Sequence, residues 1–338
     1  MKKIKIAQIG INQYSHANTI FETLTMFPDV FEVAGYALVE NEREECAGSL
    51  HIFDGYPELT LDDILNDESI EAVTVETDEI HLTKYATLAA KHGKHIHMEK
   101  PGSQSLADFE NLLNEVRKGG KVFHTGYMYR YNPYVKQILA EVKAGEFGEI
   151  HSVEAQMDCK HLPGKVIDWL ATFKGGMMFY LGCHLIDLVL QIHGDPDNIA
   201  VFNRCTGNSP VYSEDFAMAV FEYKNGCSIV KSDASELGGF ARRQLVVTGS
   251  KKTVELKPFE MITPEKPARE LYTDRTEYTS DVWTDMGNTE RAEFDRYADM
   301  MLAFASMVRG EIENPYTLDY ELKLFKTILK CCGIGEEK

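Results

Sequence analysis

The chain has 338 residues, 44% of them hydrophobic and 26% charged, which is the composition of a globular protein with a substantial core. Its length favours two domains over one. The formal net charge is −18 and no stripe of Lys and Arg is apparent, which argues against a nucleic-acid partner because phosphate binding needs a basic surface. No apolar run reaches the roughly 18 residues of a membrane span, so we expect no membrane association.

The amino-terminal segment is basic at Lys2 and Lys3, but Ile4–Gln8 alternates apolar and polar residues and does not form the apolar centre of a signal peptide. We therefore expect a first strand here and a cytoplasmic protein. The cysteines are odd in number and lack the spacing of metal ligands, which favours reduced thiols. They are Cys46, Cys159, Cys183, Cys205, Cys227, Cys331 and Cys332.

Residues 1–126 alternate strand-like and helical patterns. Strands separated by helices form right-handed βαβ units, so this part predicts an α/β domain with a doubly wound parallel sheet. Thr60–Asp63 is typical of a capping box that opens a short helix. We expect strands at 5–9, 31–39, 71–77, before Lys100 and at 121–126, and helices at 16–26, 80–92 and after Ser105.

Residues 127–314 predict an α+β domain with a large, mostly antiparallel sheet. Turn residues such as Asn225-Gly226 separate several strand-like runs. The polar stretch 258–289 is expected to be a long loop. Helices at the end of the chain, about 315–335, are expected to pack back on the first domain. A helix is expected at 134–143, strands at 149–158, 199–205, 216–223, 227–232, 244–247 and 253–256, and a later helix with the inward stripe Phe294, Tyr297, Met301, Phe304 and Val308.

The first turn contains Gly10 but has Asn12 and Ser15 where a dinucleotide-binding fingerprint has its second and third glycines. A helix amino terminus still attracts anions, and asparagine tolerates a left-handed backbone. On its own this turn is weak support for a nucleotide. Glu40 is placed to accept hydrogen bonds from a ribose diol and to repel a 2′-phosphate, although an ordinary solvated carboxylate explains it equally well.

The segment from Ala90 to Pro101 predicts a helix end, a short strand and a Glu-Lys-Pro turn. A lysine at the carboxyl end of such a strand points into the crevice where open α/β sheets bind ligands. Lys100 is therefore a candidate proton carrier, the alternative being a surface lysine beside a proline. His95 and His97 share one face of the strand with no carboxylate or thiol partner evident, so we expect no metal site.

A second cluster occupies residues 174–187. If this segment is helical, Tyr180, His184 and Asp187 share one face and form a group of proton-exchanging side chains beside glycines that permit close approach. The alternative is a polar helix face that meets water or forms hydrogen bonds within the core. For His184 alone, that alternative is favoured.

Several segments together resemble the Gfo/Idh/MocA family of nicotinamide-dependent oxidoreductases, and the resemblance extends over nearly the whole chain. Their order and spacing carry it, because any single one could arise by chance. The segments are Glu99–Pro101, Thr77–His81 followed by Ala86, Ala89 and Gly93, Gly126–Pro133, the Gly-Gly…Gly-x-His-x-x-Asp block at 175–187, and Gly249–Leu256.

The resemblance implies a Rossmann domain, a sheet domain that forms a homodimer or homotetramer, and a sugar, polyol or cyclitol substrate. It implies NAD(H) in preference to NADP(H), a preference that depends on Glu40. Lys100 and His184 would exchange the proton, with Tyr180 as a further acid or base. The implied cofactor residues are Gly10, Asn12, Glu40, Thr77, His81, Glu99 and Lys100, and the implied substrate residues are Tyr127, Arg130, Trp169 and Asp187, with His161 as another residue that would read the substrate.

Two departures from the family pattern leave alternatives open. The glycine fingerprint is degraded, and Tyr180 stands where the family usually has an aspartate four residues before the histidine. Tyrosine, with an ordinary pKa of about 10, does not supply the negative charge that makes a histidine more basic. The alternatives to a simple dehydrogenase are an enzyme of glycosidase or epimerase type that retains NAD, and a non-catalytic ligand-sensing protein on the same scaffold.

Overall fold

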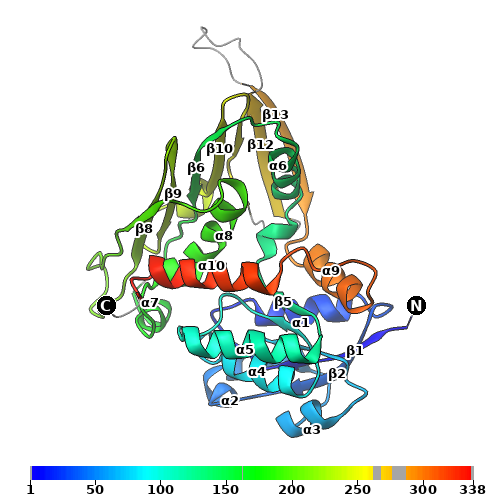
Figure 1. Ribbon diagram of the computed structural model, residues 1–338. Helices are drawn as coiled ribbons and strands as arrows, with labels where there is room; N and C mark the ends of the chain where they lie inside the picture. Colours follow the sequence, from blue (N-terminus) through cyan, green and yellow to red (C-terminus); the bar gives the residue numbers. More distant parts are fainter. Residues whose placement is uncertain (1, 162, 262–267, 276–286, 336–338) are drawn as a thin grey trace. The chain divides into compact units, whose positions relative to one another are not determined.

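The computed structural model describes residues 2–161, 163–261, 268–275 and 287–335, and these divide into two compact units (Figure 1). Unit 1 comprises the described residues of Met1–Met128 and Tyr297–Phe325, and unit 2 those of Tyr129–Arg296 and Lys326–Lys338. No helix in the described ranges has both the length and the apolar character needed to cross a membrane. The seven cysteines all lie in the described ranges, and none of them forms a disulfide bond there.

Unit 1 contains a five-stranded parallel sheet in the order β2-β1-β3-β4-β5, with helices on its faces (Figure 1). The strand order changes direction between β1 and β3, and the carboxyl ends of strands at such a switch point form the ligand crevice of open α/β sheets. The strands are β1 Ile4–Ile9, β2 Phe31–Ala37, β3 Ala72–Val75, β4 His95–Met98 and β5 Phe123–Thr125, and the helices are α1 Ala17–Met26, α2 Glu42–Glu45, η1 Ala47–Phe53, α3 Leu61–Asn66, α4 Leu82–Lys91 and α5 Leu106–Gly119.

Helix α9, Ala298–Val308, belongs to unit 1, whereas the sequence placed these residues in the second domain. Its Phe304 ring lies 5.9 Å from the ring of His97 on β4 and 5.6 Å from that of His124 on β5. Because this ring is buried in the core of unit 1, helix α9 belongs to unit 1 and not, as the sequence predicted, to the second domain. Helix α10, Leu318–Cys331, begins in unit 1 and ends in unit 2.

Unit 2 contains an eight-stranded sheet in the order β13-β12-β11-β10-β6-β9-β8-β7. Only the β6–β9 pair within it is parallel in the described residues. The strands are β6 Ile150–Gln156, β7 Asn198–Val201, β8 Phe216–Tyr223, β9 Gly226–Asp233, β10 Gln244–Gly249, β11 Thr253–Leu256, β12 Ala268–Arg275 and β13 Asn288–Phe294, and the helical segments are η2 Met128–Tyr131, whose first residue belongs to unit 1, α6 Pro133–Ala144, α7 Lys165–Leu170, η3 Met178–Gly182, α8 Cys183–Ile192 and η4 Gly239–Arg242.

Burial alternates along the central strands of unit 2, as expected for a sheet with one face packed on a core. Ala217, Ala219 and Phe221 on β8 are buried, as are Val230 on β9 and Leu245 on β10. Helix α8 packs against β6 and β9. The alternating residues on the second face are only partly buried, and they include the apolar side chains of Met218, Val220, Ile229 and Val246.

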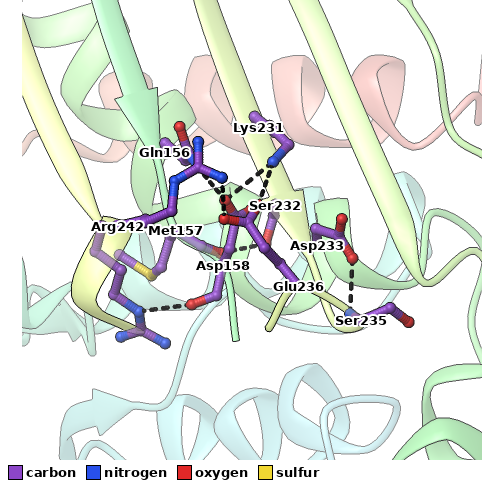
Figure 2. A network of polar contacts seen from close by, with 10 residues as sticks. Gln156, Met157, Asp158, Lys231, Ser232, Asp233, Ser235, Glu236 and Arg242 are labelled. Carbon is purple, nitrogen blue, oxygen red and sulfur yellow. Dashed lines mark hydrogen bonds and ion pairs between the residues drawn. The ribbon is translucent and has the colours of Figure 1, made fainter. Parts of the chain in front are cut away.

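The second face also carries a charged network (Figure 2). Lys231 on β9 donates to Asp158 at 3.1 Å and to Glu236 at 2.6 Å, and Gln156 also donates to Asp158. Asp158 is fully buried, and burial raises its pKa to about 6. Arg242 donates to Glu236, which completes a chain of alternating charges.

The prediction of a long loop at 258–289 is wrong. Strand β12 lies within this range, and strand β13 begins at its end. Residues 262–267 and 276–286 of the range are outside the described residues. Both strands are rich in charged and polar residues, so their alternation carried little apolar signal. Phe294, expected in a helical stripe, ends β13.

Glycine is required at position 10 for two reasons. Its φ is +85°, and a Cβ placed there would lie 2.6 Å from the Cβ of Thr77. Gly93 has a similar φ of +68° but open space around it. We expect G93A to cost about 1 kcal/mol of unfolding free energy through backbone conformation alone, and G10A to cost about 2–5 kcal/mol because overpacking is added.

Denaturant unfolding of the two variants measures this difference. Gly93 serves as the matched control for the left-handed backbone. Equal losses of unfolding free energy in the two variants would contradict the close approach of Gly10 and Thr77.

Candidate active site

The turn between β1 and α1 has the features of an anion-binding turn. Gly10 supplies the left-handed backbone and the close approach to Thr77 after β3. His16, the residue that precedes α1, makes no side-chain capping hydrogen bond. The hydroxyl of Thr77 is buried and has no hydrogen-bond partner within the described part of the chain. A helix amino terminus and an unsatisfied hydroxyl at the switch point fit a dinucleotide.

Asn12 occupies the position of the second fingerprint glycine, and its side chain is 5% exposed. Its Nδ2 donates to Oε2 of Glu79 at 2.8 Å, and its Oδ1 accepts from the backbone N–H of Tyr14 at 2.9 Å. Both ends of the amide are therefore tied down. The side chain turns inward and does not extend over the outer surface of the turn.

Glu40 follows β2 and has a φ of +50°. Among the described residues it is the one residue other than glycine with a positive φ. Its Oε1 accepts from Lys84 Nζ at 2.6 Å and from the Tyr85 hydroxyl at 2.7 Å, and His81 Nδ1 lies 3.8 Å away. These hydrogen bonds from Lys84 and Tyr85 lower the pKa of Glu40. All three contacts are with Oε1, so Oε2 is available to accept a hydrogen bond from a ribose.

Lys100 lies directly after β4 and is 1% exposed. Its Nζ lies 3.5 Å from Oε1 of Glu99, which is 2% exposed. Gly126 makes room for this pair, because a Cβ at that position would lie 2.7 Å from Oε2 of Glu99. A lysine buried beside a carboxylate at the carboxyl edge of the sheet has the surroundings of a proton-exchanging group.

Two further carboxyl groups follow β3 at the same edge, and Glu76 and Glu79 are both 0% exposed. Burial raises the pKa of Glu76 well above its usual range, the charges of Glu99 and Glu79 raise it further, and Lys100 opposes them. Burial likewise raises the pKa of Glu79 to about 8. Burial therefore favours the uncharged acid for both groups, and Glu99 is the carboxyl group that is paired with Lys100.

A row of polar side chains crosses the sheet interior below this cluster. Gln8, Thr74, His97 and His124 lie on neighbouring strands in register and are at most 2% exposed. The Nδ1 atoms of the two histidines are 2.7 Å apart, the distance of a hydrogen bond. His97 Nε2 lies 3.6 Å from Oε1 of Glu76. The expectation that His97 has no carboxylate near it is therefore wrong, because Glu76 comes from the next strand.

No group of three or more His, Cys, Asp or Glu side chains with the geometry of a metal site occurs in the ranges that the structure describes. The histidine pair is instead held by its mutual hydrogen bond. Burial lowers the pKa of His97 to about 3, so its ring is neutral.

In unit 2, the segment 174–187, considered above as a possible helix, contains a π-helical turn, η3, and continues as α8. A π-turn inserts an extra residue into a helix and is frequent at functional sites. Tyr180, on this turn, packs edge to face on Trp169 of α7, with ring centroids 5.0 Å apart. Trp169 is 6% exposed and makes the same kind of contact with Phe173.

His184, on the first turn of α8, is 3% exposed and lies edge to face with Tyr129, their ring centroids 5.1 Å apart. The Tyr129 hydroxyl donates to Glu260 at 2.5 Å. Burial and the charge of Glu260 raise the pKa of Tyr129. The charges of Arg296 and Arg243 outweigh burial and lower the pKa of Glu260. The ring beside His184 is thus held in place by a buried ionic network.

Asp187, one turn further along α8, makes a bidentate ion pair with Arg130. The distances are 2.9 Å from Nε to Oδ2 and 2.8 Å from Nη2 to Oδ1, and both side chains are 1% exposed. Gln191 donates to the same carboxylate at 2.8 Å. Paired, buried and hydrogen-bonded charges of this kind hold a helix in one position.

The structure thus brings most of the predicted residues into two groups. The first group lies at the carboxyl edge of the unit 1 sheet and consists of Gly10, Asn12, Thr77, Glu99 and Lys100. Glu40 and His81, also in unit 1, lie beside one another. Tyr127, which is 2% exposed, belongs to the same unit. Tyr180, His184, Asp187, Arg130 and Trp169 lie in unit 2, as does His161, whose backbone N–H donates to Ala234.

Sequence reasoning missed Glu76, Glu79 and Glu260. Glu76 lies at the carboxyl end of the strand predicted at 71–77 and Glu79 follows it, so the rule that placed Lys100 at the crevice applies to them equally. Glu260 lay in the segment expected to be a loop, so no pattern pointed to it.

Known proteins share both halves of this architecture. Residues 4–127 match the model of an oxidoreductase family with an NAD-binding Rossmann fold, and residues 135–255 match the Gfo/Idh/MocA carboxy-terminal domain. The uncharacterized oxidoreductase YrbE of Bacillus subtilis is 26% identical over 61% of this chain and 63% of its own length, somewhat less than two thirds. Myo-inositol 2-dehydrogenase of Thermotoga maritima is 23% identical over 72% of this chain and 73% of its own length.

Among solved structures, the aldose-aldose oxidoreductase of Caulobacter crescentus, complexed with glycerol, superposes with a TM-score of 0.75 at 17% identity and 98% coverage of both chains. This likeness agrees with the Rossmann sheet and the large mixed sheet described above. The two domain matches cover the greater part of the sequence in the same order as the two sheets. The chain belongs to the Gfo/Idh/MocA family of oxidoreductases.

Proposed function

We propose that the protein is an NAD(H)-dependent oxidoreductase acting on a hydroxyl or carbonyl group of a sugar, polyol or cyclitol. The observation that carries the proposal is the burial of Lys100 beside Glu99 at the carboxyl edge of a parallel sheet. Its relatives include an inositol dehydrogenase and an aldose oxidoreductase, which supports a polyhydroxylated substrate.

The bound nicotinamide would supply the hydride exchange, and the protein handles the proton. Lys100, as the uncharged amine, would accept the proton of the substrate hydroxyl at Nζ in oxidation and, as the ammonium, would return it in reduction. We propose His184 as a second acid or base, with Tyr129 fixing the plane of its ring. Tyr180 and Trp169 form an aromatic pair suited to stacking on the apolar face of a sugar ring. Asp187 and Arg130 would hold α8 in position.

The residues of unit 1 fit the dinucleotide. Gly10 and the amino terminus of α1 would face the pyrophosphate, with Asn12 turned inward. Oε2 of Glu40 would accept from the ribose diol, and its negative charge would disfavour the 2′-phosphate of NADP(H). Thr77 and His81 line the loop after β3.

A titration with NADH and NADPH, followed by fluorescence and thermal melting, tests the cofactor proposal. We expect NADH to bind and to raise the melting temperature, and NADPH to bind at least tenfold more weakly. E40Q removes the charge and keeps the size of the side chain, so we expect it to reduce the difference between the affinities for NADH and NADPH. Equal affinities in the parent protein would contradict a role for Glu40.

Substitution of Lys100 tests the chemistry. We expect K100M to lower the turnover of NAD⁺ with a panel of inositols and aldoses by about 10²–10⁴-fold, the usual contribution of a general acid or base, and to leave NADH affinity within about threefold. K94M is the matched control. Lys94 precedes the same strand, is 3% exposed, and donates to the backbone carbonyls of Asp67 and Ile70.

K94M is expected to lower stability without the loss of turnover seen in K100M. NADH binding without turnover of any compound in either the parent or K94M would favour the ligand-sensing alternative. Release of sugar from an aryl glycoside without net NADH would favour the NAD-retaining alternative.

We also propose that the protein assembles as a homodimer or homotetramer through the second face of the unit 2 sheet. This face combines partly buried apolar side chains, including Ile229 and Val246, with the charged network around Lys231 and Asp158 (Figure 2). Alternating charges and apolar side chains on a flat sheet are suited to an isologous contact.

Light scattering coupled to gel filtration tests the assembly. We expect I229E, which places a charge in the centre of this face, to reduce the mass to that of the 38.2 kDa chain. M26E is the control, because Met26 is an apolar residue 60% exposed at the end of α1 in unit 1. An unchanged mass in I229E would place the contact elsewhere.

A further inference from the structure

Asn12 and Glu79 join the first turn of unit 1 to the loop after β3. The Asn12 amide donates to Oε2 of Glu79 at 2.8 Å, and Glu79 is 0% exposed. The turn that contains Asn12 is the one that would hold the pyrophosphate of the cofactor. A carboxyl group is thus in direct hydrogen-bond contact with a turn expected to bind an anion.

The other oxygen of Glu79, Oε1, is buried and has no hydrogen-bond partner among the residues that the structure describes. A carboxylate in this position would have one protein donor and no exposure to bulk solvent, so the uncharged acid is favoured. Burial raises the pKa of Glu79 to about 8, against the opposing charge of Lys100, while Asp78 and Glu99 raise it further. Two other buried carboxyl groups lie close to this edge. Burial raises the pKa of Glu76 well above its usual range, and burial raises the pKa of Glu42, which lies against the backbone of Ile11, to about 7.

We propose that Glu79 gates dinucleotide binding: the uncharged acid permits the turn to hold the pyrophosphate, and the carboxylate opposes it. This inference rests on the proposed use of a dinucleotide cofactor. The carboxylate acts in two ways. It adds a negative charge in a poorly solvated position next to the anion, and it holds the Asn12 amide more tightly, which stiffens the turn.

Binding and protonation are then linked. Because the pyrophosphate binds better to the protein with uncharged Glu79, its affinity falls as pH rises through the pKa of that group. The phosphodiester charges of NADH do not change over this range. With a pKa of about 8 for Glu79, we expect the dissociation constant for NADH to rise about tenfold between about pH 7 and about pH 9.

The experiment is a fluorescence titration of the full chain with NADH from about pH 6 to about pH 9.5. E79Q replaces the acid with an uncharged group of the same size, so we expect its affinity to stay within about twofold across the range. E270Q is the matched control, since Glu270 of unit 2 is another buried carboxyl group that accepts from an asparagine amide, Asn132 Nδ2 at 2.7 Å, with a pKa that burial raises to about 7. E270Q is expected to keep the tenfold change of the parent.

Three results would overturn the inference: an affinity of the parent that does not change with pH, the same pH dependence in E79Q as in the parent, or loss of that dependence in E270Q. Absence of NADH binding by all three proteins at every pH would overturn the cofactor proposal together with the gate. NADH binding with no pH dependence would overturn the gate alone.

Thermal melting supplies a readout that needs no ligand. Because the pKa of Glu79 is higher in the folded chain than in the unfolded one, its contribution to stability is complete at low pH. That contribution is lost as pH rises from the unfolded carboxyl range to about 8. As pH increases over this interval, we expect the melting temperature of E79Q to rise relative to that of the parent. A difference between the two melting temperatures that stays the same at every pH would show that Glu79 titrates normally and would overturn the gate.

Discussion

Charge balance around Lys100 is the constraint on which the carboxyl edge of the unit 1 sheet depends. Three buried carboxyl groups, Glu76, Glu79 and Glu99, act on one buried lysine. If all were ionised, the cluster would carry an excess of negative charge in surroundings that solvate it poorly. The arrangement is stable because Glu99 pairs with Lys100 and burial favours the uncharged acid at the other two positions. The lysine therefore faces one paired carboxyl group and two carboxyl groups whose uncharged form is favoured.

The polar row in the sheet interior connects this cluster to the glycine turn. Parallel sheets covered on both faces are usually apolar throughout, yet Gln8, Thr74, His97 and His124 lie side by side on four strands. Gln8 donates to the carbonyl of Gly10 at 3.1 Å, so the row ends at the turn itself. Hydrogen bonds fix orientation where apolar packing would allow rotation. The strand that carries Lys100 and the turn that would hold the cofactor are thereby held in one register.

Much of the fold was predictable because its signals are local. The capping box at Thr60, the αβ alternation and the Asn225-Gly226 hairpin each depend on a few neighbouring residues, and each is present. Strands β12 and β13 were missed because their polar residues gave no apolar alternation. Lys100 was found through its position after a strand. Glu76 and Glu79, the carboxyl groups that follow β3, were not found, since a sequence does not show which strands lie next to one another.

The same limit explains why the degraded glycine fingerprint could not be interpreted from sequence. At position 10 glycine is required, because any Cβ would meet Thr77. At position 12 the requirement is different: nothing must extend over the outer surface of the turn. An asparagine satisfies it only if a buried acceptor draws its amide inward, and Glu79, 67 residues away in the chain, is that acceptor. Asn12 and Glu79 therefore act as one structural unit, because the amide keeps its inward orientation only while the carboxyl group accepts from it. Their combination keeps the shape of the turn while placing a titratable group beneath it.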